Sequence, residues 1–147
     1  MKISTRGRYG TRLLLDLASQ QDNGPIPLKD IARRQHISLS YIEQLVTPLI
    51  AAGLIKSTRG ARGGIRLAKS PHEINLSDVV GLLEGSISPV DCLDDPEACP
   101  RSDVCATRDV WSEMKDAMDG VLKSVTIHDL VERQKCKQQT AEAMYHI

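Results

Sequence analysis

The sequence contains no phenylalanine, one tryptophan and three tyrosines in 147 residues. Aromatic side chains therefore cannot build its core, although apolar residues still make up 41% of the chain, enough for an aliphatic core. The sequence also lacks a run of about 18 apolar residues and an N-terminal apolar segment of the signal-peptide type. We therefore expect a cytoplasmic protein with no membrane partner.

Net charge is absent as well, because 19 basic and 19 acidic residues cancel. The two halves of the chain nevertheless differ in sign. Residues 1–70 hold 12 Lys and Arg against 4 Asp and Glu, a charge of +8, and residues 71–147 hold 7 against 15, a charge of −8. A basic first half is typical of a nucleic-acid face, and an acidic second half would restrict DNA to one side of the molecule. Two solvated halves that attract each other are the alternative.

Apolar residues recur at helical spacing between residues 40 and 50 and predict a helix with two distinct faces. One face is apolar and consists of Ile42, Leu45, Val46 and Leu49. The other face carries Ser40, Glu43, Gln44 and Thr47. Gln pairs with adenine edges, Glu accepts from cytosine, and Ser and Thr serve either role, so this second face is equipped to read bases in a major groove. An ordinary solvated helix face is the alternative.

The residues before this helix favour the DNA-reading interpretation. Apolar residues within Leu28–Ala32 predict a second short helix. The turn at residues 36–38 ends on Ser38, a typical N-cap residue. Helix, turn and helix together form the motif that places its second helix in DNA. Pro48 removes a backbone donor, so we expect the second helix to kink or restart there.

The run Ile55–Leu67 predicts a β-hairpin with strand-like ends around a glycine-rich turn. Glycines let the backbone approach a sugar-phosphate surface, and Arg59 and Arg62 suit phosphate contacts or a narrow minor groove. A nucleotide phosphate loop is the alternative, but no Gly-Lys-Ser/Thr follows and no strand leads into a helix. The hairpin is therefore interpreted as the wing of a DNA reader.

Helix signals complete the first domain. A first helix begins near Thr5–Gly7 and ends at Asn23–Pro25, and another spans Leu76–Glu84 after an Asn75 cap. The sequence thus predicts a mainly α fold with a small β-hairpin wing, that is, a winged helix-turn-helix with a long C-terminal dimerisation helix. We divide the chain into a DNA-binding domain (1–85), a cysteine-rich cluster-binding loop (86–105), dimerisation helices (106–133) and a polar tail (134–147).

Three of the four cysteines lie in an acidic, proline-containing loop, as Cys92, Cys99 and Cys105. Structural disulfides are not expected in a cytoplasmic chain. Thiolates are favoured ligands of soft metals and iron-sulfur clusters, so these cysteines are candidate metal ligands. Their spacing is not that of a zinc site with two Cys-x2-Cys pairs, and three unliganded thiols are the alternative.

After the loop, a helical stripe of apolar side chains predicts a dimerisation interface. It consists of Trp111, Met114, Met118, Val121, Leu122 and Val125. A helix of about 18 residues would be roughly 27 Å long, longer than the small reader can cover, so we expect a second copy to cover the stripe. Packing within one chain is the alternative. A short helix capped by Thr126 is expected to follow, and the tail from Gln134 is expected to be loosely ordered.

Several segments together resemble the Rrf2 family of winged-helix regulators, and within it the iron-sulfur regulators of the IscR type. They are Met1–Gly10, Tyr41–Leu45, Arg59–Gly64 and Leu83–Gly85. The resemblance extends to about Val131. It implies a homodimer on a pseudo-palindromic double-stranded DNA operator. It also implies that the three loop cysteines hold an iron-sulfur cluster, with [2Fe-2S] favoured over [4Fe-4S].

The resemblance also implies roles for individual residues in DNA binding. Ser40, Glu43 and Gln44 match base readers of the family, and Arg59 matches a wing contact. The full set of residues that we predict to contact DNA is Ser38, Ser40, Tyr41, Glu43, Gln44, Arg59 and Arg62.

The chain departs from this family at the fourth cluster ligand. IscR-type proteins have a histidine three residues after the last loop cysteine, where this chain has Arg108. Nitric oxide sensors of the NsrR type use an acidic residue near the start of the partner subunit, and the matching position is Arg8. A guanidinium is not a ligand, so the fourth ligand must be another residue, an external thiol or water. Cys136, the remaining thiol, ranks below an oxygen ligand because it lies in the polar tail.

Three classes of function follow from these observations. The first is an iron-sulfur transcription regulator, acting on genes of cluster assembly or stress. The second is a metal-free Rrf2-type regulator controlled by thiol redox state or by a protein partner, or a repressor that senses nitric oxide. The third is an enzyme, which we do not expect, because the sequence offers no substrate-pocket motif and no paired catalytic base.

Overall fold

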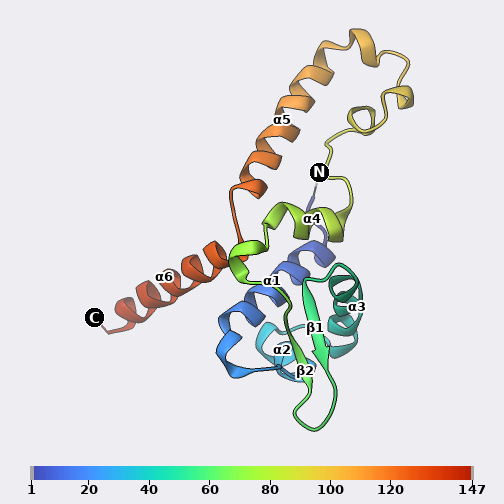
Figure 1. The fold of residues 1–147 in the computed structure, drawn as a ribbon. Helices are drawn as coiled ribbons and strands as arrows, with labels where there is room; N and C mark the ends of the chain where they lie inside the picture. The colour runs from blue at the N-terminus through green and yellow to red at the C-terminus, as the bar shows by residue number, and fades with distance from the viewer. Residues whose placement is uncertain (1, 147) are drawn as a thin grey trace.

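The computed structural model describes residues 2–146. Its helices and strands are α1 (Thr5–Ser19), α2 (Leu28–Gln35), α3 (Leu39–Ala51), β1 (Ile55–Thr58), β2 (Gly64–Leu67), α4 (Leu76–Glu84), α5 (Ala106–Lys123) and α6 (Ile127–Tyr145). The short 3-10 turns are η1 (Gln21–Asn23), η2 (Pro71–Glu73), η3 (Asp91–Leu93), η4 (Pro96–Ala98) and η5 (Ser102–Val104). Figure 1 shows a reader, formed by residues 2–85 with the start of α6, and an arm, formed by residues 86–123.

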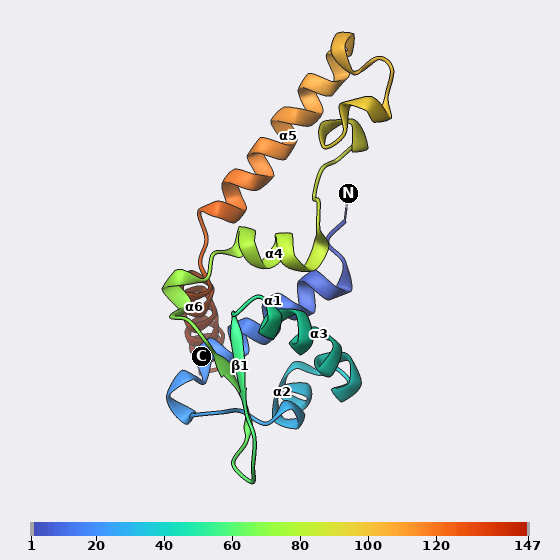
Figure 2. The ribbon, with the colours of Figure 1, turned by 45° about the vertical axis from the view of Figure 1, so that its right-hand side comes forward.

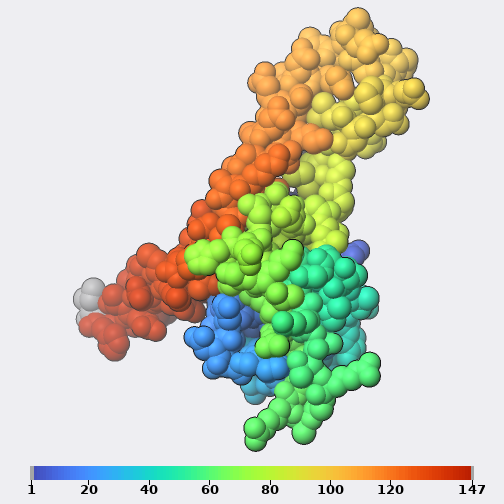
Figure 3. All heavy atoms as spheres, viewed as in Figure 1, coloured from blue at the N-terminus to red at the C-terminus, as the bar shows by residue number. Residues whose placement is uncertain are grey.

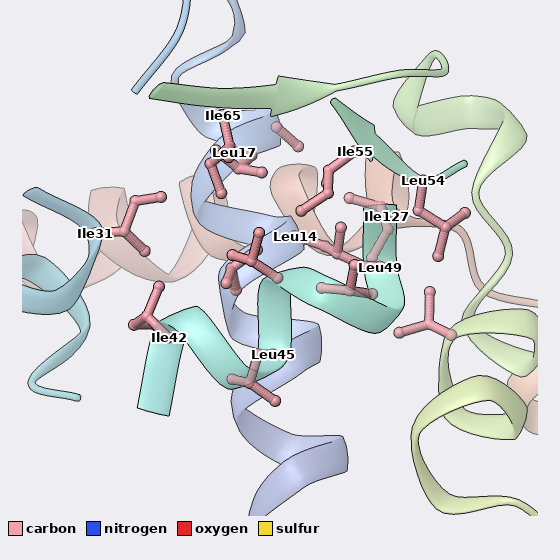
Figure 4. Close-up of a cluster of buried hydrophobic side chains, with 14 of the residues drawn as sticks. Leu14, Leu17, Ile31, Ile42, Leu45, Leu49, Leu54, Ile55, Ile65 and Ile127 are labelled. Carbon is pink, nitrogen blue, oxygen red and sulfur yellow. The ribbon is translucent and has the colours of Figure 1, made fainter. Parts of the chain in front are cut away.

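Aliphatic side chains form the core of the reader, as the absence of phenylalanine requires. Leu14 and Leu17 of α1 lie at its centre, where side chains from α3 and the hairpin surround them (Figure 4). The labelled residues around them are Ile31, Ile42, Leu45, Leu49, Leu54, Ile55, Ile65 and Ile127, all buried. Because the apolar face of α3 is buried here, its polar face is turned outward.

The hairpin is an antiparallel pair in which Ile55 lies opposite Leu67 and Thr58 lies opposite Gly64. Ile26 pairs with Ile65 through two backbone hydrogen bonds of 2.8 and 2.9 Å and so ties the segment before α2 to β2. A Cβ on Gly64 would lie 2.3 Å from the carbonyl oxygen of Ile26. Only glycine therefore allows this close approach of the two backbones.

The arm leaves the reader at the end of α4, reaches its tip through the cysteine loop and returns along α5 (Figures 1 and 2). The returning chain is fastened beside the start of α4. The Leu76 N–H donates to the Val125 carbonyl at 2.8 Å, and the Ile127 N–H donates to the Ile74 carbonyl at 2.9 Å. Helix α6 begins there with Ile127 in the core and then projects from the reader (Figure 3).

Several sequence predictions are confirmed in detail. Helix α4 spans the predicted Leu76–Glu84, and the Asn75 side chain accepts from the Ser77 N–H at 2.9 Å. The Ser38 hydroxyl caps α3 by accepting from the Tyr41 N–H at 3.3 Å. The mainly α fold with a two-stranded hairpin is also confirmed. Local capping chemistry is strong at these positions, so the sequence alone locates these boundaries.

Other expectations are wrong. Helix α3 does not restart at Pro48 but continues to Ala51, because Leu49 is fully buried and packing fixes the last turn, whereas the alternative, a kink at Pro48, stays a prediction. The tail from Gln134 is not loosely ordered, since α6 continues to Tyr145 and its Lys, Gln, Ala and Glu residues are good helix formers. Val125 lies beyond the end of α5 and is only 4% exposed, so it belongs to the reader and not to the predicted interface stripe.

Candidate nucleic-acid interface and cysteine loop

The outward face of α3 has the composition needed for reading base edges. Ser40, Glu43, Gln44 and Thr47 are all exposed. The Thr47 hydroxyl donates to the Glu43 carbonyl at 3.4 Å, whereas no hydrogen bond within residues 2–146 engages the side chain of Glu43 or Gln44. These two side chains therefore keep their donors and acceptors for a partner. The structure thus brings Ser38, Ser40, Glu43 and Gln44 together at the exposed N-terminal half of one helix.

The one aromatic residue of α1, Tyr9, supports the start of α3. The Tyr9 and Tyr41 rings meet edge to face with centroids 5.8 Å apart, and the Arg12 guanidinium lies 5.3 Å from the Tyr9 ring centroid. Tyr41 is consequently half-buried, so its ring serves packing and only part of it faces solvent. Sequence reasoning missed Tyr9, although its spacing of four residues from the buried Leu13 points to the same helix face.

The wing presents its predicted cations at the end of the molecule opposite the arm's tip (Figure 2). Arg59 and Arg62 are exposed, and neither side chain forms an ion pair or hydrogen bond within the part of the chain that the structure describes. Gly60 has φ +110°, which lets the loop turn sharply, and the Gly63 N–H donates to its carbonyl at 3.0 Å. Both arginines are therefore available for phosphate or minor-groove contacts.

One arginine of the basic half, Arg34, is bound within the fold and is not available to DNA. Arg34 donates to both carboxylate oxygens of Asp16, at 3.0 and 2.6 Å, and Gln35 donates to the same carboxylate at 2.9 Å. The bond to Asp16 raises the pKa of Arg34. Asp16 is 7% exposed, and this pair joins α1 to α2. Arg34 therefore fixes how α2 packs on α1, and the charge excess of the first half overstates the number of cations free for DNA.

The three loop cysteines lie on successive turns of the arm. Cys92 is in η3, Cys99 directly follows η4, and Cys105 is the N-cap of α5. All three are free, half-buried thiols, whereas Cys136 is an exposed thiol on α6. Three cysteines therefore lie in the loop of the arm, and the fourth, Cys136, lies on α6.

Asp94 connects the Cys92 turn to its surroundings. Lys115 donates to its carboxylate at 2.8 Å, Ser88 donates at 2.6 Å, and the Ser86 hydroxyl donates to the other oxygen. These bonds, with Lys115 first, hold the pKa of Asp94 well below its usual range, and the bond with Asp94 raises the pKa of Lys115. Sequence reasoning treated Asp94 only as part of an acidic loop, and no local pattern marked its partner 21 residues away.

The last loop cysteine is also held by its neighbours. The Thr107 hydroxyl lies 3.2 Å from the Cys105 sulfur, and this contact, followed by the Arg108 backbone N–H, lowers the pKa of the Cys105 thiol. The side chain of Arg108 turns elsewhere and donates from Nε to the Cys92 carbonyl oxygen at 3.1 Å. Arg108 thus links the first and last cysteines of the loop.

The loop matches an iron-sulfur cluster in the kind of donor but not in the number of ligands. Three thiols suit such a cluster, yet Arg108 cannot ligate and contacts the Cys92 carbonyl instead. No group of three or more His, Cys, Asp and Glu side chains among residues 2–146 is arranged to hold a metal ion. The loop as it stands thus offers three thiols without a closed coordination shell.

Helix α5 carries an apolar face that the described residues cover only in part. None of its residues is buried, and Val121 is 64% exposed. A cavity of about 650 Å³ lies between this face, the N-terminal segment and the start of the loop, with Met118 and Leu122 on one wall and Ile3 and Ile87 on the others. Apart from Val125, the predicted stripe therefore lies on the surface of the arm, with its side chains exposed or half-buried. No helix within the described residues is long and apolar enough to cross a bilayer.

Comparison with known proteins connects this architecture to gene regulation. Residues 3–133 match the family model Rrf2, described as an iron-dependent transcriptional regulator. The chain is 47% identical over 131 residues to the protein rrf2 of Nitratidesulfovibrio vulgaris, covering 89% of this chain and 87% of that protein.

Two solved structures show that the likeness extends to the fold. CymR, reported as the global cysteine regulator of B. subtilis, is 44% identical with a TM-score of 0.78, and the match covers 90% of this chain and 98% of CymR. IscR of T. potens is 38% identical with a TM-score of 0.75, and the match covers 91% of this chain and 88% of that one. Similarity therefore extends to proteins of both the CymR and the IscR type.

Proposed function

The chain belongs to the Rrf2 family of DNA-binding transcription regulators, and we propose that it acts as a homodimer on a pseudo-palindromic operator. The observation that carries the proposal is the exposed face of α3, where Ser40, Glu43 and Gln44 face solvent on a helix anchored by the core. A helix held in this way enters a major groove without unfolding any other part of the reader. Arg59 and Arg62 of the wing would contact the flanking phosphates or minor groove.

The exposed apolar face of α5 supports the homodimer. Trp111, Val121 and their neighbours are too exposed to serve the fold of a single chain. A two-fold dimer through α5 would cover them and present two α3 helices to successive major grooves, about 34 Å apart. The symmetry of the operator would then mirror the symmetry of the protein.

We further propose that an iron-sulfur cluster at Cys92, Cys99 and Cys105 controls operator affinity. Such a cluster supplies a centre whose charge and integrity respond to oxidants and small ligands. The chain's own contribution is the route from the loop to the reader: the loop leads directly into α5, and α5 returns to the start of α4 through Leu76 and Val125. Any change in the order of the loop is thereby coupled to the arrangement of the two readers, and operator binding would in turn favour the matching state of the loop.

A second candidate is a regulator that uses the same cysteines as thiols without metal. It is favoured by Arg108, which cannot complete a coordination shell, and by the lowered pKa of the Cys105 thiol, which raises its thiolate fraction. Similarity to CymR is compatible with this candidate. Both candidates share the DNA-binding function and differ only in what the loop binds.

One purification separates the two candidates. Wild type, Cys92→Ala and the control Cys136→Ala are purified without oxygen and analysed for absorbance, iron, sulfide and zinc. The cluster proposal expects a brown wild type with iron and sulfide, a bleached Cys92→Ala and an unaffected Cys136→Ala. A colourless wild type that reconstitutes no cluster, yet loses DNA binding on reversible thiol oxidation, would support the second candidate and reject the first.

The DNA-binding proposal is tested independently by selecting sequences from a random duplex library. Gln44→Ala is expected to lose discrimination of roughly 1–3 kcal/mol at one symmetric pair of positions. Arg59→Ala is expected to weaken binding to all sequences alike and to reduce the salt slope by about 1. Asp22→Ala, exposed and distant in sequence from α3 and the wing, serves as the control. Absence of any selected sequence would reject the proposal.

A further inference from the structure

Two side chains of α5 hold the turn that carries Cys92. Arg108 Nε donates to the Cys92 carbonyl oxygen at 3.1 Å, and Lys115 Nζ donates to the Asp94 carboxylate at 2.8 Å. Arg108 and Lys115 are seven residues apart, so they lie two turns apart on the same side of the helix. Both contacts reach η3 or the residue that ends it.

The same turn is also joined to the beginning of the loop. The Asp94 carboxylate accepts from the hydroxyls of Ser86 and Ser88 in addition to Lys115. One exposed ion pair contributes little to stability, but here an arginine, a lysine and two serines bind one short turn. Their combined geometry restrains η3 more than any single bond would.

Cys105 belongs to the same frame as Cys92. It is the N-cap of α5, and its carbonyl accepts from the Arg108 N–H at 3.1 Å. Helix residues three apart have Cβ atoms about 5–6 Å from each other, and Arg108 spans from that turn to Cys92. The first and last cysteines of the loop are therefore both attached to the start of α5, Cys105 as its N-cap and Cys92 through Arg108.

Cys99 differs from the other two in its attachments. The Cys99 carbonyl accepts from the Ser102 N–H at 3.1 Å, and the Ser102 hydroxyl donates to Pro96 at 2.7 Å. Both bonds stay inside the loop, where η4 packs against η3 and η5. Within the described chain, no side-chain hydrogen bond joins η4 or Cys99 to α5.

We propose that Arg108 and Lys115 are positioning residues that fix Cys92 and Cys105 in one frame on α5, while Cys99 lies on a turn that packs against η3 and η5 without a bond to α5 and shifts to complete the site. This inference rests on the proposed regulatory role of the loop and names how that loop is organised. The thiols of Cys92 and Cys105 are held in place before any metal or oxidant binds. Binding of Cys99 to the same centre is then the step that changes the order of the loop. Because η3 is bound to α5, that change is transmitted to α5 directly.

Short-range cross-linking of the metal-free, reduced, full-length protein tests the arrangement. Cys136→Ala serves as the background, a short bis-maleimide as the probe, and mass spectrometry counts the three possible pairs. Yields are normalised to the single-alkylation rate of each cysteine. We expect the Cys92–Cys105 pair to exceed each pair with Cys99 by at least about threefold, because a fixed pair has the higher effective concentration.

The variant Arg108→Gln with Lys115→Gln is expected to bring the three yields to within about twofold of one another, since no side chain of α5 then holds Cys92 close to Cys105. The control Arg133→Gln with Lys123→Gln removes the same charge outside the loop and is expected to keep the wild-type bias. The single variant Arg108→Lys keeps Lys115 and retains a donor at position 108. It is therefore expected to show part of the bias that the double glutamine variant loses. Thermal unfolding of each variant checks that the reader remains folded.

Equal yields for all three pairs in the background protein would overturn the proposal, as would an unchanged bias in the double glutamine variant. The assay uses neither DNA nor metal, so it is independent of the proposed function. A protein that shows the bias but binds no operator rejects the regulatory role alone. A protein that binds an operator without the bias rejects only the positioning role of Arg108 and Lys115.

Discussion

The pairing of α1 with α2 depends on one buried carboxylate. Asp16 accepts hydrogen bonds from Arg34 and Gln35, and its side chain is 6% exposed in the ion pair. Arg12 adds a bond from Nε to the Gln35 side chain at 3.1 Å. These contacts set how α2 lies on α1, and α2 in turn positions α3. A charged residue far from the predicted reading face is therefore part of the geometry that presents it.

Asp16→Ala is expected to lower the free energy of unfolding by roughly 1–3 kcal/mol, because it leaves the donors of Arg34 and Gln35 without their acceptor. Urea denaturation measures the change. Asp22→Ala removes an exposed carboxylate from the turn that follows α1 and should leave stability within about 0.5 kcal/mol of wild type. If both variants were equally stable, the Asp16 network would be irrelevant to the fold.

Elements of the reader meet where side chains are small. The carbonyl of Ile26 approaches Gly64 so closely that a Cβ would lie 2.3 Å from it, and a Cβ on Gly10 would lie 2.3 Å from Leu83. These contacts join the hairpin to the segment before α2, and α1 to α4. Close backbone approach explains the glycine at position 64, and close packing of the Leu83 side chain explains the glycine at position 10.

Gly64→Ala is expected to destabilise the protein by roughly 1–3 kcal/mol, because the backbone of Ile26 and Pro27 cannot move aside easily. Gly81→Ala is the matched control, since a Cβ there meets nothing within 4 Å and alanine favours helix α4 by up to about 1 kcal/mol. Thermal melts compare the two variants. The account of Gly64 fails if its substitution is as harmless as that of Gly81.

Helix α6 begins with a reciprocal capping box. The Thr126 N–H and hydroxyl donate to the Asp129 carboxylate at 2.8 and 2.9 Å, and the Asp129 N–H donates back to the Thr126 hydroxyl at 3.2 Å. The bonds from Thr126, with the backbone N–H first, lower the pKa of Asp129. This cap fixes the first turn of α6 at the point where the arm returns to the reader.

The cap gives a pH dependence of known sign. Because the folded-state pKa of Asp129 is lowered, its stabilisation is present above the unfolded-state value of about 3.9 and disappears as the pH falls through the folded-state value. The difference in unfolding free energy between wild type and Asp129→Ala should therefore be full at pH 7 and should shrink in acid. Denaturation at several pH values measures it, with exposed Asp116→Ala as the control. A difference that grew in acid would contradict the capping role.

At the scale of the whole molecule, the reader and the arm differ in how they are covered. The reader has one core of buried apolar residues, whereas α5 buries none of its own. The arm is amphipathic and projects from the reader (Figure 3). Its apolar face has no buried residue within the described chain, and this exposure is the basis for the proposed dimer.

Val121→Glu is expected to convert the dimer to a monomer, because it places a charge on the exposed apolar face of α5. Sedimentation measures the mass, and binding to a full operator should fall while binding to an isolated half-site persists. Lys123→Glu introduces the same acidic side chain two residues later, about 200° around the helix, and should leave the dimer intact. A monomeric wild type, or dimers of both variants, would reject the α5 interface.

The sequence by itself determined the elements whose signals are local. Capping residues such as Ser38 and Asn75, the spacing of apolar residues in α3 and the glycines of the wing each specify structure within a few residues. The candidate base readers follow from the same periodicity, because the buried face of a helix defines its exposed face. The cysteine spacing likewise marked the loop, although it did not identify its ligand.

Only the tertiary structure decided the features that depend on residues distant in sequence. It pairs Asp16 with Arg34, Asp94 with Lys115, and Arg108 with the Cys92 carbonyl, and it places Val125 in the reader. It also carries α3 through Pro48, since packing of Leu49 outweighs the lost backbone bond. The physical reason is that local signals act along the chain, whereas burial and long-range hydrogen bonds depend on which segments meet in space.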